Sequence, residues 1–356
     1  LLGLTATPER MDGKSILPYF HNRIAAEIRL PEAIDRKLLC PFQYFGVTDT
    51  VDLDALKWSA GGYQKSELEH VYTFSGAVAD RRADHVVTAL LKYVTDIDEV
   101  KGLGFCVTVD HAEFMCRYFN DHNIPSMCLT GQSSDEERAA AKRRLVSGEV
   151  RFIFVVDIYN EGVDIPEVNT VLFLRPTESL TIFLQQLGRG LRLSEDKECL
   201  TVLDFIGQAN RKYNFEDKFA ALLSNTTRSV SREIKDGFVS VPKGCYIQLE
   251  KKAAKYILEN IRASYGNTAG LVTRSLLHGG QRVGADTQKL LGLLPSRSES
   301  NLQVLFLLSH LCQSGCHRGL FRTTGGCFGQ SVCKARCNRL PRDFVPVGRP
   351  SAFGQL

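Results

Sequence analysis

The chain has 356 residues, of which 44% are hydrophobic and 24% are charged. This composition is typical of folded globular domains and excludes a fibrous, membrane-spanning or wholly disordered chain, and no run of about 18 apolar residues is present. The formal net charge of +4 does not indicate a nucleic-acid surface, because residues 287–356 alone carry a surplus of seven positive charges, which leaves −3 for everything before them.

The eleven cysteines also divide by position. Six are scattered before residue 250, as expected of reduced thiols in a cytoplasmic protein that has no contact with a membrane. The other five crowd into residues 312–337. The chain begins at Leu1, with neither an initiator methionine nor a targeting pattern, so we expect it to start inside a longer gene product.

The first part of the chain reads as two segments. Residues 1–29 open with LLGLTATPER, a strand followed by Thr5, Ala6 and Thr7, where Thr7 with Pro8 makes a good helix start. Residues 30–97 are mixed in pattern, with a helix and a strand in LPEAIDRKLLCPFQYFGV and a loop and a helix in SAGGYQKSELEHVY. We interpret residues 30–97 as a connecting or accessory segment.

Residues 98–208 show the clearest order. Short apolar runs (GLGFCV, SMCL, RFIFVV, NTVLFL and CLTVLDFI) alternate with helical patterns at 110–122, 135–147 and 180–191. Ser134 and Glu137 fit a capping box, and Gly148 fits a helix end. This alternation predicts an α/β fold with a doubly wound parallel sheet, which binds ligands beyond the carboxyl ends of its strands.

The end of the chain divides near residue 279. Residues 209–278 predict a helical extension, with helices at 211–223 and 251–265. Residues 279–356 form a Cys/Arg-rich tail with no sustained period. Cys312, Cys316, His317, Cys327, Cys333 and Cys337 fit a zinc site poorly because paired C-x2-C knuckles are missing, so no metal site is predicted. We favour loss of the reading frame after about residue 275, with a zinc module as the minority alternative.

The sequence QQLGRGLR places Gln185, Gly188, Arg189 and Arg192 at the spacing Q-x-x-G-R-x-x-R. Arginines at i and i+3 share one helix face, and two guanidinium groups together can stabilise the terminal phosphate of ATP as its bond breaks. The plainer alternative is a pair of salt-bridged surface arginines. Directly upstream, EGVDIP contains Gly162, which permits close backbone approach, and Asp164, which can bind a ribose hydroxyl or hold an arginine. Its alternative is a tight turn.

Two polar turns follow predicted strands. Thr108, Asp110 and His111 follow the first strand of the lobe, and Thr130 and Gly131 follow the second. Hydroxyl groups and backbone N–H groups at helix starts bind phosphate oxygens, so these five residues are candidates for nucleic-acid contact. Each is also explained as an ordinary helix cap, and a structural role is the stronger one for His111.

Together, the Thr5–Thr7 tripeptide, the turn at Phe105–His111, EGVDIP and QQLGRGLR resemble superfamily 2 helicases. Three segments are similar to sequences of bacterial DEAD/DEAH-box proteins related to type III restriction-enzyme motor subunits. They are LGLTATPER, FLRPTESLTIFLQQLGRGLR and LDFIGQANRKYNFEDKF. The segment KDGFVSVPKGCYIQLEKKAAKYILENIRA resembles the start of the carboxy-terminal domain that often follows such motors. The resemblance covers residues 1 to about 275.

The resemblance implies a RecA-like helicase C-terminal lobe at 98–208, preceded at 1–29 by the end of a first lobe. It implies ATP and Mg²⁺ in the cleft between two lobes, and movement along DNA, with RNA as the alternative. Arg189 and Arg192 would be arginine fingers, and Gln185, Gly188, Gly162 and Asp164 would contact the nucleotide. Thr5, Ala6 and Thr7 would couple hydrolysis to movement.

The sequence departs from the family pattern in three ways. Val156 stands where many relatives have threonine, and Glu161 stands where many have arginine. There is also no G-x-x-x-x-G-K-[ST] loop and no D-E-x-[HD] box, so Mg²⁺ would be held mainly by a lobe that this chain lacks. We therefore expect no ATP hydrolysis by the chain alone. The alternatives are a non-catalytic module that binds nucleic acid or a partner, and a restriction subunit, which would need a nuclease domain.

Overall fold

The computed structural model describes residues 16–59, 62–72, 76–156, 165–224 and 227–264. All of them belong to the first of the two units into which contacts divide the chain, Leu1–Asn267. The tail at 279–356, with the cysteine cluster of the zinc alternative, lies outside the described residues.

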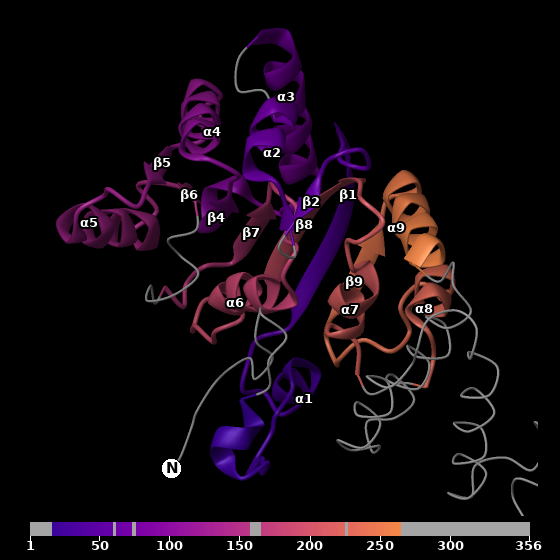
Figure 1. Cartoon of the computed structure of the whole chain (residues 1–356). Helices are drawn as coiled ribbons and strands as arrows, with labels where there is room; N and C mark the ends of the chain where they lie inside the picture. Colours follow the sequence, from indigo (N-terminus) through magenta and orange to yellow (C-terminus); the bar gives the residue numbers. More distant parts are fainter. Residues whose placement is uncertain (1–15, 60–61, 73–75, 157–164, 225–226, 265–356) are drawn as a thin grey trace, which may run out of the picture. The chain divides into compact units, whose positions relative to one another are not determined.

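Seven parallel strands form one sheet in the order β5-β6-β4-β7-β8-β1-β9 (Figure 1). The chain runs outward from β4 to one edge of the sheet and then returns to the other side of β4, which makes the sheet doubly wound as predicted. The strands are β1 (Phe42–Asp52), β4 (Gly102–Phe105), β5 (Ser126–Leu129), β6 (Phe152–Val155), β7 (Thr170–Phe173), β8 (Leu200–Gln208) and β9 (Tyr246–Leu249). A separate antiparallel pair is formed by β2 (Trp58–Ser59) and β3 (Gly62–Tyr63).

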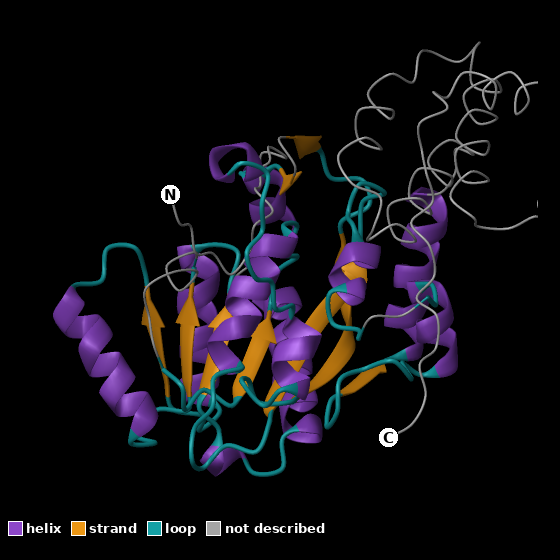
Figure 2. Ribbon diagram, turned by 90° about the horizontal axis from the view of Figure 1, so that it is seen from below, coloured by secondary structure: helices purple, strands orange, loops and turns teal. Residues whose placement is uncertain are grey.

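Helices cover both faces of the sheet (Figure 2). Each face has its own buried core. On one face pack α3 (Gly76–Tyr93) and α4 (Val109–Asp121). On the other face pack α5 (Asp135–Val146), α6 (Leu180–Gly190), α7 (Phe215–Ala220) and α9 (Lys251–Ser264). The remaining described helical segments are η1 (Leu17–Phe20), α1 (Leu30–Asp35), α2 (Lys65–Val71), η2 (Ile97–Glu99) and α8 (Val230–Asp236).

All five strands predicted within residues 98–208 are present, as are the three helices. The sheet is wider than this segment, because β1 pairs with β8 along most of its length and β9 pairs with β1. Residues 30–97 therefore contribute a strand to the same sheet, together with the long helix α3, which the sequence pattern did not reveal. Residues 209–264 contribute β9 as well as helices.

Local signals in the sequence explain several helix ends. In the capping box of α5, the Glu137 N–H donates to Ser134 Oγ at 3.2 Å and the Ser134 N–H donates to Glu137 Oε2 at 2.7 Å. Gly148 follows the end of α5 with a φ of 77°, a left-handed conformation that glycine adopts at little cost. None of the described helices is long and apolar enough to cross a membrane.

The glycines of β4 make room for aromatic rings on the neighbouring strand. A Cβ atom on Gly102 would lie 2.1 Å from the Phe152 ring, and one on Gly104 would lie 2.4 Å from the Phe154 ring. Phe119 of α4 meets both rings edge to face, with ring centroids 5.3 Å and 4.9 Å apart. This packing fixes α4, and with it the turn between β4 and α4, against the sheet.

Candidate functional site

Helix α6 carries the Q-x-x-G-R-x-x-R residues. It begins after Ser179, whose Oγ accepts the Ile182 N–H at 3.4 Å, and it buries Phe183, Gln186, Leu187 and Gly190 against the sheet. An α-helix turns by about 100° per residue, so Gln185, Gly188 and Arg189 lie on the opposite side of the helix from these four. The three are half-buried, as is Arg192, which follows the helix end. We call these three residues, together with Arg192 two positions beyond the helix end, the α6 stripe.

The two glycines near the end of α6 differ in what they are needed for. A Cβ atom on Gly190 would lie 2.3 Å from Leu200 Cδ1, so the packing of α6 on β8 requires glycine there. A Cβ atom on Gly188 would meet no atom of the described residues within 4 Å. Glycine inside a helix lowers stability by about 1 kcal/mol relative to alanine. No contact with the described residues requires glycine at position 188.

The turn between β4 and α4 holds two predicted nucleic-acid residues in the interior. Thr108 is 9% exposed and caps α4, with its Oγ1 accepting the His111 N–H at 3.2 Å. His111 is 1% exposed, and its Nε2 lies 3.2 Å from Arg82 Nη1. Burial lowers the pKa of His111 well below its usual value, and the charge of Arg82 lowers it further, so the ring is neutral. Both side chains therefore have structural contacts here, and Asp110 alone of the three is exposed.

The turn after β5 lies at the same end of the sheet, on the other side of β6. Thr130 is half-buried and closes the turn, because its N–H donates to Ser133 Oγ at 3.0 Å and its Oγ1 accepts the Gln132 N–H at 3.2 Å. Gly131 is exposed. Of the five nucleic-acid candidates, Asp110 and Gly131 are thus the most accessible to a ligand, and Asp110 is an anion that would repel a phosphate.

A buried charged cluster on the α3–α4 face involves Arg82, which the sequence did not single out. Arg82 donates to both carboxylate oxygens of Asp49, at 2.9–3.2 Å, and to the Leu174 carbonyl oxygen at 3.0 Å. Its guanidinium group also stacks 4.6 Å from the centre of the Tyr72 ring. Burial alone would lower the pKa of Arg82, but the Asp49 carboxylate raises it overall. We call Asp49, Tyr72, Arg82 and His111 the Arg82 cluster.

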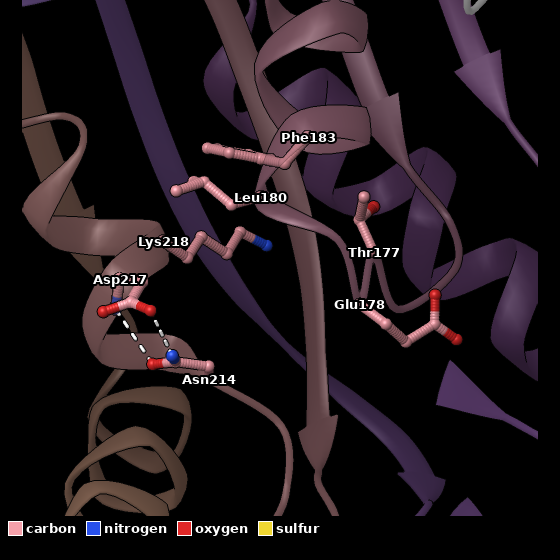
Figure 3. Close-up of a pocket in the computed structure, with 7 residues that line it drawn as sticks. All are labelled: Thr177, Glu178, Leu180, Phe183, Asn214, Asp217 and Lys218. Carbon is pink, nitrogen blue, oxygen red and sulfur yellow. Dashed lines mark hydrogen bonds between the residues drawn. The ribbon is translucent and has the colours of Figure 1, made fainter. Parts of the chain in front are cut away.

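A second buried cation, Lys218, lines a pocket on the other face of the sheet (Figure 3). Its Nζ donates to Asp204, which also accepts a hydrogen bond from the Tyr44 hydroxyl group. The pocket has a cavity volume of about 110 Å³ and is lined by Thr177, Glu178, Leu180, Phe183, Asn214, Asp217 and Lys218. Figure 3 shows the Lys218 side chain extending toward Thr177, below Leu180 and Phe183. Asn214 and Asp217 lie beside it and are hydrogen-bonded to each other. This volume suits a few water molecules and is too small for a nucleotide.

The remaining predicted site residues lie outside the described part of the chain. These are Thr5, Ala6 and Thr7 near the start, and Gly162 and Asp164 in EGVDIP. Val156, just before the second of these groups, is 8% exposed and packs in the core of the α3–α4 face. Its side chain therefore contributes to packing, as expected of an apolar residue at this position.

Sequence patterns alone did not identify the buried cations Arg82 and Lys218 or the half-buried Lys197. One signal was available, because Asp204 interrupts the apolar strand LTVLDFI, and a buried carboxylate calls for a cation. The sequence does not show which lysine or arginine is the partner, because each cation reaches its partner only in the folded chain.

Comparisons with known proteins relate this part of the chain to helicases. The model of the family "Helicase conserved C-terminal domain" matches residues 85–194, which include α4, β4 to β7 and the α6 stripe. "Putative ATP-dependent helicase IRC3" of Saccharomyces cerevisiae is 28% identical over 211 residues, which cover 59% of this chain and 30% of the yeast protein. "Type I restriction enzyme EcoAI endonuclease subunit" of Escherichia coli is 26% identical over 232 residues, covering 57% of this chain and 27% of that subunit.

Among solved structures, a fragment of an HsdR subunit of a type I restriction enzyme from Vibrio vulnificus has a TM-score of 0.44 at 20% identity, covering 69% of this chain and 43% of that one. The chain spans about a third of the length of the yeast relative, and similar shares of other curated relatives. Sequence motifs, family match and the doubly wound parallel sheet agree on one assignment. The chain is related to the superfamily 2 helicases and contains their conserved C-terminal domain, a RecA-like α/β lobe.

Proposed function

We propose that this chain supplies the C-terminal motor lobe of an ATP-dependent helicase or translocase that acts on DNA. In this proposal Arg189 and Arg192 contact the terminal phosphate of ATP across a cleft, and Gln185, Gly188, Gly162 and Asp164 contact the nucleotide. Thr130 and Gly131 face the nucleic acid, and Asp110 meets it through its backbone N–H group in the first turn of α4, because its carboxylate would repel a phosphate. The buried Thr108 and His111 shape this turn. Thr5, Ala6 and Thr7 couple hydrolysis to movement.

The α6 stripe is the observation that carries this proposal. Gln185, Gly188 and Arg189 lie on the side of α6 that is turned away from the core, and Arg192 is half-buried just beyond the helix end. A salt-bridged surface helix, the plainer alternative, would not need glycine at position 188, where the described residues leave room for a side chain. A close approach by a ligand or another lobe gives Gly188 a reason to be there.

Two different observations support DNA as the substrate and the need for a second lobe. DNA is favoured because the relatives include a subunit named as part of a restriction enzyme. ATP and Mg²⁺ need a phosphate-binding loop and an acidic box, and neither pattern occurs in this sequence. We therefore propose that the whole protein hydrolyses ATP and that the 356-residue chain alone does not.

ATP hydrolysis by the whole gene product tests the proposal, with and without single-stranded and duplex DNA. DNA should stimulate hydrolysis, and Arg192→Ala should lower kcat by about 10³-fold, as expected when an arginine finger is lost. The matched control is Arg143→Ala, which removes an exposed arginine from α5 of the same lobe and should leave kcat within about twofold.

Three results would contradict parts of the proposal. If the whole protein binds DNA but hydrolyses no ATP, the chain is a binding module that has kept the motor fold. If Arg143→Ala and Arg192→Ala lower kcat equally, the α6 stripe has no special role. Hydrolysis by the 356-residue chain itself, persisting through repurification, would disprove the need for a second lobe.

A further inference from the structure

One lysine joins the end of α6 to the segment that leads into β7. Lys197 Nζ donates to the carbonyl oxygens of Pro166 at 2.5 Å, Val168 at 3.0 Å and Gly190 at 3.1 Å. A lysine ammonium group has three N–H donors and no acceptor, so these three carbonyl groups use its whole hydrogen-bonding capacity. The three acceptors come from two stretches of chain that are more than 20 residues apart.

This arrangement carries an energetic cost. Burial lowers the pKa of Lys197, because taking an ammonium group out of water disfavours its charged form, and the nearby Arg192 lowers the pKa further. The contact to Gly190 offsets part of this cost, since the carbonyl groups at a helix C-terminus attract a positive charge. A neutral side chain could fill the same space, but it could not donate to three carbonyl oxygens at once.

The position of Lys197 relates it to the proposed nucleotide side of the lobe. Gly190 lies between Arg189 and Arg192, and Pro166 is the last residue of the EGVDIP segment. One ammonium group therefore fixes the backbone beside both arginines relative to the last residue of EGVDIP and the backbone just after it. A shift of about 1 Å in groups that contact a reacting phosphate lowers rates by about 10²-fold, so the accuracy of this connection matters for hydrolysis.

We propose that Lys197 is a positioning residue, which holds the end of α6 in the orientation that lets Arg189 and Arg192 act on ATP. This proposal rests on the proposed function of the α6 stripe. Lys197 itself contacts neither nucleotide nor nucleic acid, because all three of its donors are engaged by carbonyl groups of the lobe.

The test uses the whole protein with Lys197→Met, which keeps the length of the side chain and removes its donors and charge. Lys235→Met, at an exposed position in α8, is the matched control. In Lys197→Met, kcat should fall by about 10- to 100-fold, whereas the KM for ATP should stay within about threefold, because contacts made in the transition state act on kcat. Lys235→Met should leave both parameters unchanged.

A double-mutant cycle separates positioning from general loss of stability. If Lys197 acts through Arg192, Lys197→Met should cause little further loss of kcat in a protein that already carries Arg192→Ala. A purely stabilising lysine would give the same fold-loss in both backgrounds, and this would overturn the proposal. All rates are measured at a temperature at which circular dichroism shows the variants to be folded. Lys197→Gln, which keeps an amide donor, serves as a second and milder variant.

The failure of this proposal differs from failure of the proposed function. Normal kcat in Lys197→Met and Lys197→Gln, with Arg192→Ala inactive, would overturn the role of Lys197 and leave the motor function standing. Absence of ATP hydrolysis in the unsubstituted protein would overturn the motor function, and the role of Lys197 with it.

Discussion

Charged side chains are enclosed on one face of the sheet and partly accessible on the other. On the α3–α4 face, the Arg82 cluster is closed on itself: Asp49 binds the guanidinium group through two oxygens, Tyr72 stacks on it, and His111 is neutral beside it. On the α6–α7 face, Lys218 and Asp204 form a buried pair, but α6 also keeps the half-buried α6 stripe on the side away from the core.

This contrast separates charges that the fold encloses from charges that are only half-buried. The Arg82 cluster joins β1, α3 and α4, so its loss should be felt as a loss of stability. The α6 stripe lies on the side of α6 away from the core, so under the proposed function its loss should be felt in hydrolysis. The following predictions test this division, beginning with the largest expected effect on stability.

Asp49→Asn should lower the free energy of unfolding by about 3–5 kcal/mol, because it leaves the Arg82 charge buried without a counter-charge. The side chains of Asp49 and Arg82 are only 1% and 10% exposed, so water cannot replace the carboxylate. Urea unfolding of the 356-residue chain measures this loss through the fluorescence of Trp58, its only tryptophan. Asp80→Asn, at an exposed position of α3, is the control. A loss below about 1 kcal/mol would show that the cluster is not closed as described.

His111 should make stability depend on pH. Its pKa in the folded protein is well below the ordinary value of 6.5, so below that pH the unfolded chain binds a proton that the folded chain does not. Stability should therefore fall as the pH decreases from 6.5, by up to about 1.4 kcal/mol per pH unit. His111→Gln should remove this contribution. Between pH 6.5 and pH 5 the unsubstituted protein should therefore lose up to about 2 kcal/mol more of its free energy of unfolding than His111→Gln does.

Urea unfolding at several pH values between about 5 and 7 measures the effect of His111 as the difference between the two proteins. Taking the difference cancels the titration of the carboxylates that both proteins share. His122→Gln, at an exposed histidine at the end of α4, is the control. Parallel stability curves for the unsubstituted protein and His111→Gln would contradict a neutral buried histidine.

Gly188→Ala should give the smallest change in stability and of the opposite sign, a gain of about 0.5–1 kcal/mol, because alanine favours the helix and has room there. The neighbouring Gly190→Ala is the control, and it should lose stability because its Cβ atom would overlap Leu200. Thermal unfolding compares the two. In the whole protein Gly188→Ala should also lower ATP hydrolysis, and unchanged hydrolysis would remove the functional reason for this glycine.

Much of the fold could be predicted because its signals are local. The alternation of apolar runs with helical periods predicted five strands of the sheet and three helices that pack on it. Ser134 with Glu137 marked the start of α5. The pattern did not reveal that β1 and β9 join the same sheet, because strand pairing depends on partners far along the chain: Tyr44 lies opposite Val202, for example. The long helix α3 was missed as well.

The candidate site divides in the same way. Gln185, Gly188 and Arg189 belong to one helix, so their spacing alone determined that these three share a side, whereas Arg192 follows the helix end. Only the tertiary structure decided that Gly190 is required for packing and Gly188 is not, and that His111 is buried. It alone brought Lys197 to Pro166 and Arg82 to Asp49. The physical reason is that a helix period is set by neighbouring residues, whereas burial and the pairing of charges depend on contacts between segments that only the folded chain brings together.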